Sequence, residues 1–263
     1  MHNFNYVKAA SASNAAALLS GKPDAKYLAG GQSLIAAMKL RFAQPTDLID
    51  LSGAGELMSM GASGGKLTVG AMATHAAIAA DAHVKAHCAA LTQLSEGIGD
   101  RQVRNRGTIG GSLANNDPAA DWPAAVLACN ATVVTTTRRI AADDFFKGLY
   151  ETALNAGELI TAIEFPAVKR AAYVKFKQPA SRFALVGVFV CDTGAGVRVA
   201  VTGASQSGVM RVKALEEALS KSWSAEAARA VKIGADGMNN DLHGSAEYRA
   251  HLIRVLAARA VGE

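Results

Sequence analysis

Two glycine pairs, each in a segment that ends in serine, are the parts of this sequence best suited to chemistry. The first lies in Ala29-Gly30-Gly31-Gln32-Ser33 and the second in Thr108-Ile109-Gly110-Gly111-Ser112, about 80 residues further on. Because glycine has no Cβ, backbone N–H groups in such segments can close around phosphate oxygens. Two such loops could hold the two ends of one long, doubly phosphorylated ligand. We therefore expect a dinucleotide.

Taken singly, each glycine pair is also typical of an ordinary turn. Neither loop contains the G-x-G-x-x-G fingerprint of the Rossmann fold, and the chain has no G-x-x-x-x-G-K-[ST] phosphate loop. The loops therefore do not encode the usual nicotinamide-type pyrophosphate turn. A flavin dinucleotide is the leading expectation.

Further motifs surround the loops in a fixed order. They are the stretches 26–34, 69–75 and 104–121, followed near the end by Tyr173-Val174-Lys175-Phe176-Lys177 and Asp241-x3-Ser245-x2-Tyr248-Arg249. Together they resemble the FAD-binding medium subunit of the molybdenum hydroxylases, the group that contains aerobic carbon monoxide dehydrogenase and the xanthine dehydrogenases. The resemblance covers nearly the whole chain, and it implies an oxidoreductase flavoprotein with FAD as its cofactor.

The expected elements, taken with this resemblance, predict an α+β fold in two domains. The resemblance implies an FAD-binding domain at 1–167, with lobes of about 1–55 and 56–167, and a smaller α+β C-terminal domain at 168–263. Sequence patterns predict strands at 4–7, 26–29, 47–51, 57–60, 66–69, 131–137, 159–165, 173–176, 184–190 and 197–201. They predict helices at 15–19, 33–41, 76–80, 84–94, 122–129, 213–220, 225–233 and 246–260. The second glycine motif is expected to lie in a long loop that starts at Gly97.

The resemblance implies that FAD stretches between the two lobes, with both glycine loops facing its pyrophosphate. Asp121 and Asn115 would hold the sugar or ribityl part, while Lys177 and Ile160 would lie near the isoalloxazine ring. By residue type alone, a helix cap is the favoured role of Asp121, and Lys177 is equally a surface lysine. The full set of expected cofactor contacts is Lys26, Leu28, Ala29, Gly30, Gly31, Gln32, Ser33, Leu34, Thr108, Ile109, Gly110, Gly111, Ser112, Asn115, Asp121, Ile160 and Lys177.

Gln32 occupies a loop in which some related flavoproteins carry a histidine that is covalently joined to the flavin. Glutamine cannot form that bond, so FAD is expected to be bound non-covalently. No catalytic acid, base or nucleophile is expected. His75 is expected to pack in the core, and the pair His83 and His87 lacks the further ligand that a zinc site needs.

Composition excludes several other functions. The net charge of +5 comes from scattered Lys and Arg, which argues against nucleic-acid binding. No apolar stretch reaches the roughly 18 residues that a membrane span requires, and the start resembles no secretion signal, so a cytoplasmic protein is expected. Three separated cysteines, Cys88, Cys129 and Cys191, cannot supply the four thiolates of an iron–sulfur cluster.

The resemblance implies an electron-transfer role inside a heterotrimer, which would assemble as a dimer of heterotrimers. A small subunit would hold the iron–sulfur clusters and a large subunit the molybdenum cofactor, and FAD would pass electrons to a quinone, NAD⁺ or oxygen. Two alternatives stay open: a self-contained FAD-dependent oxidase or reductase of the same superfamily, and a non-catalytic assembly subunit. The substrate of the whole complex would be selected by another chain.

Overall fold

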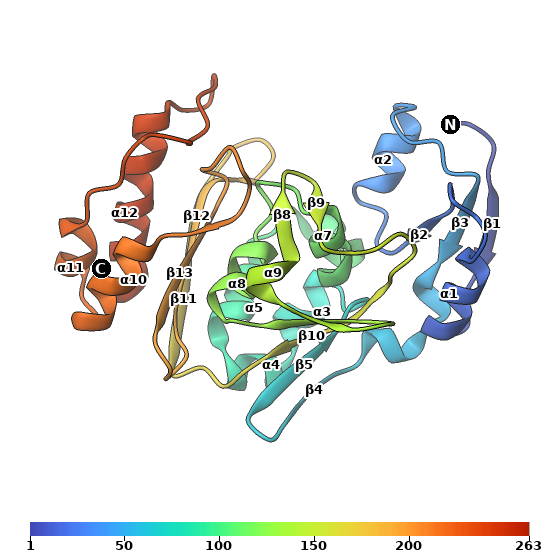
Figure 1. Ribbon diagram of the computed structural model, residues 1–263, viewed down its shortest axis with the longest axis horizontal. Helices are drawn as coiled ribbons and strands as arrows, with labels where there is room; N and C mark the ends of the chain where they lie inside the picture. Colours follow the sequence, from blue (N-terminus) through green and yellow to red (C-terminus); the bar gives the residue numbers. More distant parts are fainter. Residues whose placement is uncertain (263) are drawn as a thin grey trace.

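The computed structural model describes residues 1–262, which form three parts that follow one another along the chain (Figure 1). A small first lobe lies at one end, a larger second lobe occupies the middle, and a C-terminal sheet with its helices lies at the other end. Each part combines helices with a β-sheet, which confirms the α+β class.

The first lobe is a parallel three-stranded sheet in the order β1-β3-β2, flanked by two helices. Ser11 begins the first helix by accepting a hydrogen bond from the Asn14 N–H, as a serine N-cap does. The first glycine loop connects the end of strand β2 to helix α2, which is where parallel sheets commonly bind ligands. The elements are β1 Asn5–Lys8, α1 Ala12–Leu19, β2 Lys26–Leu28, α2 Leu34–Lys39 and β3 Asp47–Asp50.

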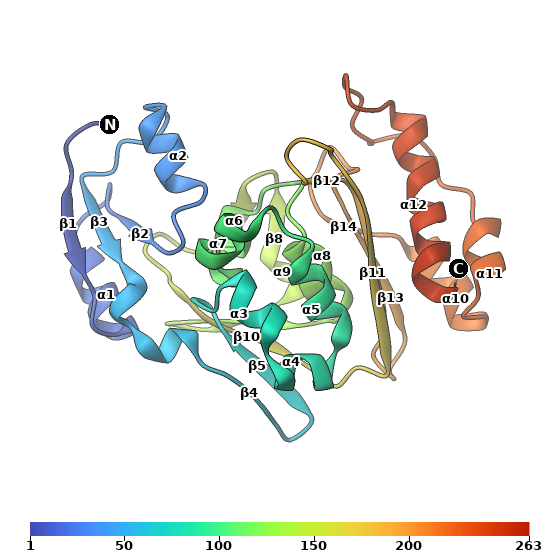
Figure 2. The ribbon, with the colours of Figure 1, turned by 180° about the vertical axis from the view of Figure 1, so that it is seen from behind.

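The second lobe is an antiparallel five-stranded sheet in the order β4-β5-β10-β6-β7. Helices α3, α4 and α5 lie against it (Figure 2), and helix α8 is buried along its whole length. Its strands are β4 Met60–Ser63, β5 Lys66–Gly70, β6 Thr132–Thr135, β7 Arg139–Ala141 and β10 Ile160–Phe165, with the hairpin β8 Phe146–Gly148 and β9 Glu151–Thr152. Its helices are α3 His75–Ala80, α4 Ala82–His87, α5 Ala89–Glu96, α6 Arg101–Arg106, α7 Ile109–Asn115, α8 Trp122–Ala128 and α9 Ala142–Phe145.

Residues 97–121 contain two short helices, so the prediction of a long loop was wrong. Asp100 caps helix α6 by accepting from the Val103 N–H at 2.8 Å, and Thr108 caps helix α7 by accepting from the Gly111 N–H at 3.1 Å. Helix α7 was not predicted because its two glycines are poor helix formers. The Thr108 side-chain cap compensates for their low helix propensity.

Two further predicted elements differ from the structure. The single helix expected at 84–94 is interrupted at Cys88, whose extended backbone separates α4 from α5. The strand expected at 57–60 is mostly a 3₁₀ turn at Gly55–Met58, and strand β4 begins only at Met60.

The C-terminal part is an antiparallel sheet in the order β11-β12-β13-β14, covered by three helices. Every residue of strand β12 is buried, because Phe189 and Cys191 pack against the second lobe while Val188 and Val190 pack against the helices. One core therefore continues across the predicted boundary at 167, and the division into domains 1–167 and 168–263 stays a prediction. The elements are β11 Arg170–Lys177, β12 Ala184–Asp192, β13 Val197–Thr202, β14 Met210–Arg211, α10 Lys213–Lys221, α11 Ala225–Ala230 and α12 Ala246–Gly262.

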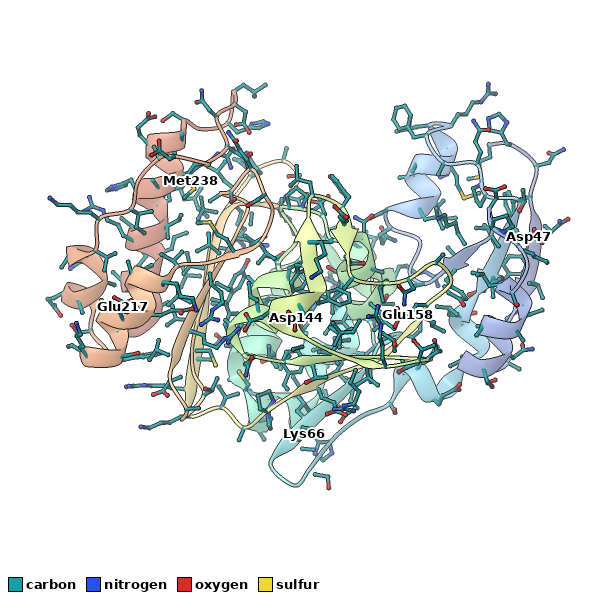
Figure 3. The ribbon with its side chains drawn as sticks, viewed as in Figure 1. Asp47, Lys66, Asp144, Glu158, Glu217 and Met238 are labelled. Carbon is teal, nitrogen blue, oxygen red and sulfur yellow. The ribbon has the colours of Figure 1, made fainter. Side chains whose placement is uncertain are left out.

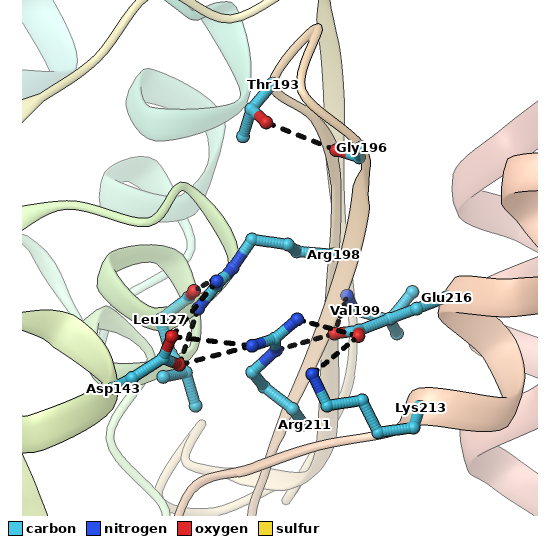
Figure 4. Close-up of polar contacts among 9 residues, drawn as sticks. All are labelled: Leu127, Asp143, Thr193, Gly196, Arg198, Val199, Arg211, Lys213 and Glu216. Carbon is cyan, nitrogen blue, oxygen red and sulfur yellow. Dashed lines mark hydrogen bonds and ion pairs between the residues drawn. The ribbon is translucent and has the colours of Figure 1, made fainter.

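An ion-pair network joins the second lobe to this sheet (Figure 4). Asp143 of helix α9 accepts from Arg198 of strand β13 at 2.6 Å and lies 3.3 Å from Arg211 of strand β14. Arg211 also forms a bidentate ion pair with Glu216, which accepts from the Val199 N–H.

Within residues 1–262, no helix is both long enough and apolar enough to cross a membrane.

Candidate functional site

A cavity of about 540 Å³ lies where the three parts of the chain meet. Its wall combines the loop between β2 and α2, helix α7 with the segment after it, the stretch 154–160, and Phe183 from the C-terminal part. This volume is in the range of small-molecule and cofactor sites. The predicted site residues in the wall are Lys26, Ala29, Gly30, Gly31, Gln32, Ser33, Leu34, Thr108, Gly110, Gly111, Ser112, Asn115, Asp121 and Ile160.

Three predicted residues do not belong to the cavity wall. Leu28 lies behind the first loop, against Gly31. Ile109 is fully buried in the core, because helix α7 turns Thr108, Ser112 and Asn115 toward the cavity and Ile109 away from it. Lys177 is exposed at the end of strand β11.

The first glycine loop carries the free hydrogen-bond donors of the site. Within residues 1–262, the backbone N–H groups of residues 30–34 donate to no acceptor, and the Ser33 side chain does not cap helix α2. Gly31 has a φ of +75°, a conformation that glycine adopts without strain. Lys26 also lines the cavity. A run of unpaired N–H groups beside a lysine favours an anion such as a diphosphate.

Most backbone donors of the second glycine motif are already paired. The N–H groups of Ile109 and Gly110 donate to Ala73 and Ala71 at 3.2 and 2.8 Å, and that of Gly111 donates to the Thr108 hydroxyl. Its glycines instead allow close packing, since a Cβ at Gly110 would lie 2.6 Å from the Ala71 Cβ. Of residues 108–112, only the Thr108 N–H donates to no acceptor among residues 1–262, so this motif offers a phosphate fewer backbone donors than the first loop. The placement of both loops against the pyrophosphate stays a prediction.

Asp121 lines the cavity, but its carboxylate already has partners in the C-terminal sheet. The Lys175 amine lies 2.9 Å from one oxygen, and the Tyr173 hydroxyl donates to the same group. Burial raises the pKa of Asp121, and the charge of Lys175 opposes that shift. Lys175 also donates to the Gly97 carbonyl at 3.0 Å. The lysine of strand β11 that contacts a wall residue is thus Lys175, two residues before the predicted Lys177, although Lys175 does not itself line the cavity.

Glu158, which is not one of the predicted contacts, lies in the cavity wall on the side of the second lobe that faces the first (Figure 3). Hydrogen bonds from Arg138 above all lower the pKa of this carboxyl from 4.5 to about 2. Thr135 and the Asn155 N–H also donate to it, at 2.6 and 2.8 Å. With its oxygens so occupied, Glu158 stabilises the wall and is not placed to act as a general base.

Phe183 and His75 are also among the wall residues that were not predicted as contacts. Phe183 is half-exposed and presents an aromatic side chain from the C-terminal part. His75 is buried, and its Nδ1 accepts a hydrogen bond from Trp122 Nε1 at 3.1 Å. The motif at 69–75 includes His75, but its residue type favoured packing in the core, and Phe183 lies outside all of the motifs. Among the described residues, no three His, Cys, Asp or Glu side chains are placed to bind a metal ion.

Comparisons with known proteins agree over the same segments. A family model described as the FAD binding domain in molybdopterin dehydrogenase matches residues 2–168. The nicotine 6-hydroxylase medium subunit of Paenarthrobacter nicotinovorans is 38% identical, over 98% of this chain and 96% of that protein. The structure of carbon monoxide dehydrogenase from Hydrogenophaga pseudoflava matches with a TM-score of 0.89 at 35% identity, covering 98% of this chain and 96% of that one. Quinoline 2-oxidoreductase from Pseudomonas putida 86 matches with a TM-score of 0.88 at 29% identity, covering 99% and 96%.

The residues of the cavity fit the cofactor that this family carries. The free N–H groups of residues 30–34 and Lys26 suit an anionic diphosphate, while Ile160 and Phe183 offer an apolar surface to a planar ring. The family match covers well over half of the chain, and the structural match extends over nearly all of it. The chain belongs to the molybdenum hydroxylase family as its FAD-binding subunit, an oxidoreductase flavoprotein.

Proposed function

We propose that this chain binds FAD non-covalently in the cavity and transfers electrons from the iron–sulfur clusters of a partner subunit to an external acceptor. The observation that carries the proposal is the run of unpaired N–H groups at residues 30–34 in the wall of a cavity of about 540 Å³. When bound, FAD supplies the ability to accept electrons singly and to release them as a pair. This chain supplies its binding, orientation and electrostatic surroundings.

Each part of the cavity is suited to one part of the cofactor. The first loop and Lys26 bind the diphosphate, and Ser112 and Asn115 on helix α7 offer polar groups to the sugar and ribityl portions. Asp121 supports this wall through Lys175 and Tyr173, and it borders the same space. Because Gln32 replaces the histidine that covalent attachment requires, no bond to the protein forms.

The chain is proposed to work in a dimer of heterotrimers. Relatives of nearly the same length are named as medium chains or as subunits of dehydrogenase complexes. A small subunit would hold the iron–sulfur clusters and a large subunit the molybdenum cofactor, because the three cysteines of this chain are all buried as free thiols. The external acceptor would be a quinone, NAD⁺ or oxygen.

The test is purification of the untagged protein from its native host, followed by a visible spectrum and a gel of the proteins that co-elute. We expect flavin that acid releases, together with two further subunits and iron–sulfur absorbance. Flavin on a solitary chain would favour the self-contained oxidase or reductase. A colourless chain that takes up no added FAD would contradict the proposal and favour a non-catalytic assembly subunit.

A further inference from the structure

His75 has a fixed tautomer in the cavity wall. The Trp122 indole N–H donates to His75 Nδ1 at 3.1 Å, and an indole nitrogen can only donate, so Nδ1 carries no proton. Burial, assisted by the charge of Arg104, lowers the pKa of His75 from 6.5 to about 4, so the ring is uncharged at neutral pH. The single ring proton must therefore be on Nε2.

The Nε2–H group of His75 is unpaired and keeps some accessible surface. It has no acceptor among residues 1–262, yet no fully buried side-chain nitrogen or oxygen of these residues lacks a hydrogen-bond partner. Nε2 must therefore have accessible surface, and the space that His75 borders is the cavity. Gly107 keeps this edge of the ring uncovered, since a Cβ there would lie 2.8 Å from Nε2.

Gly107 also places this donor beside the first glycine loop. A Cβ at Gly30 would lie 2.8 Å from the Gly107 Cα, so Gly107 contacts the loop on one side and the imidazole on the other. The His75 N–H donates to the Gly107 carbonyl at 2.9 Å, which holds the two residues together. The first loop and His75 Nε2 are thus neighbours at the same end of the cavity.

We propose that His75 is an uncharged hydrogen-bond donor to the bound dinucleotide, with Nε2–H donating to an oxygen of its diphosphate beside the N–H groups of the first loop. Trp122 is the positioning residue, because its indole fixes the tautomer that places the proton on Nε2. Arg104 is the charged group whose field acts on the ring, and its side chain donates to the carbonyls of Ile98 and Gly99. The inference rests on the proposed function, and it adds a residue that the glycine motifs do not include.

Two matched substitutions distinguish the loss of the Nε2–H donor from a disturbance of the fold. In His75→Asn the amide oxygen can still accept from Trp122, but the donor at the Nε2 position is lost; in His75→Gln the amide nitrogen can restore that donor. The apo form of the full chain would be titrated with FAD, ADP-ribose and riboflavin. We expect H75N to weaken FAD and ADP-ribose binding about 10-fold or more and to leave riboflavin binding unchanged, because a hydrogen bond to a charged group is lost. H75Q should recover most of the affinity.

A second measurement needs no substitution. In the wild-type chain labelled with ¹⁵N-histidine, nitrogen-correlated NMR should show His75 as the Nε2–H tautomer, and its Nε2 resonance should shift when ADP-ribose is added. Equal affinity of H75N and the wild type for ADP-ribose, or an Nε2 resonance that does not respond, would overturn the assignment. A wild-type chain that binds neither FAD nor ADP-ribose would instead refute the proposed function.

Discussion

Gly30 determines how closely the first lobe approaches the second. A Cβ at this position would lie 2.1 Å from the Arg106 carbonyl oxygen, which belongs to helix α6 of the other lobe. A backbone atom cannot move aside as a flexible side chain can. Gly30 therefore has two roles. It allows the two lobes to make contact, and its N–H group is the first of the unpaired donors in the loop.

We expect Gly30→Ala to separate the lobes at the cavity and to lower the free energy of unfolding by about 1–3 kcal/mol, as overpacking does. The purified variant should retain much less FAD than the wild type. Gly61→Ala is the matched control, because a Cβ there would meet nothing within 4 Å. Flavin released per chain and the thermal midpoint measure both effects, and equal flavin content in G30A and G61A would contradict this role.

The ionised carboxylate of Glu158 is expected to stabilise the fold, and the pH dependence of stability tests this. Its pKa of about 2 in the folded chain is below the 4.5 of an ordinary glutamate, so its ionised form stabilises the fold. This contribution is complete above pH 4.5 and is lost as the pH falls from 4.5 toward 2. We expect Glu158→Gln to lower the free energy of unfolding by about 1–3 kcal/mol at pH 7. Denaturant titrations at pH 7 and pH 3.5 should show this difference shrinking, and a constant difference would exclude ionisation as its source.

At the scale of elements, Asn116 holds the β8–β9 hairpin against the end of helix α7. Its backbone is left-handed, with a φ of 43°, and its side-chain amide donates to the carbonyls of Gly148 and Glu151 at 2.8 and 2.9 Å. The Tyr150 N–H returns a bond to the Asn116 carbonyl at 3.2 Å. The end of helix α7 and the hairpin therefore behave as one unit.

We expect Asn116→Gly to loosen this unit while keeping the backbone conformation. The loss of two hydrogen bonds should cost about 1–2 kcal/mol and should raise hydrogen exchange within residues 146–152. Asn130→Gly is the control, because Asn130 is also left-handed, with a φ of 54°, and is exposed. Exchange that rises equally in both variants would show that the side-chain amide of Asn116 is not what holds the hairpin.

The sequence predicts those parts of the structure in which interacting residues are close together along the chain. The strand, loop and helix around Gly30 follow from neighbours in sequence, and the sheets of the C-terminal part follow from alternating apolar residues. Helices α6 and α7 were missed because six or seven residues are too few to show a helical period. Lys175 and His75 were missed because their partners, Asp121 and Trp122, are 54 and 47 residues away.

At the scale of the whole molecule, Lys175 connects the C-terminal sheet to the cavity wall. Its amine is buried and contacts both Asp121 and the Gly97 carbonyl. We expect Lys175→Met to lower the free energy of unfolding by about 3 kcal/mol, because Asp121 would remain buried without its cation. Lys177→Met, on the exposed end of the same strand, should change it little.

The double variant Asp121→Asn/Lys175→Met tests whether the cost comes from the buried charge. Chemical denaturation of the single and double variants forms a double-mutant cycle. The double variant should recover more than half of the stability that K175M loses, since no unpaired carboxylate then remains. A double variant as unstable as the sum of the two single variants would show that the two side chains act independently.

The three cysteines provide a way to measure how often the C-terminal part separates from the second lobe. Cys88, Cys129 and Cys191 come from the α4–α5 junction, the end of helix α8 and strand β12, and they are buried in one core. Hydrogen bonds with Cys191 and Cys88 raise the pKa of the Cys129 thiol well above its usual value, which makes this thiol a poor nucleophile. Because Cys129 is fully buried in this shared core, we expect a thiol reagent to reach it when the C-terminal sheet moves off the second lobe. The rate at which Cys129 is alkylated in a folded sample would report how often that opening occurs. Bound FAD should slow the alkylation if Phe183 and Asp121 enclose the cofactor from both sides.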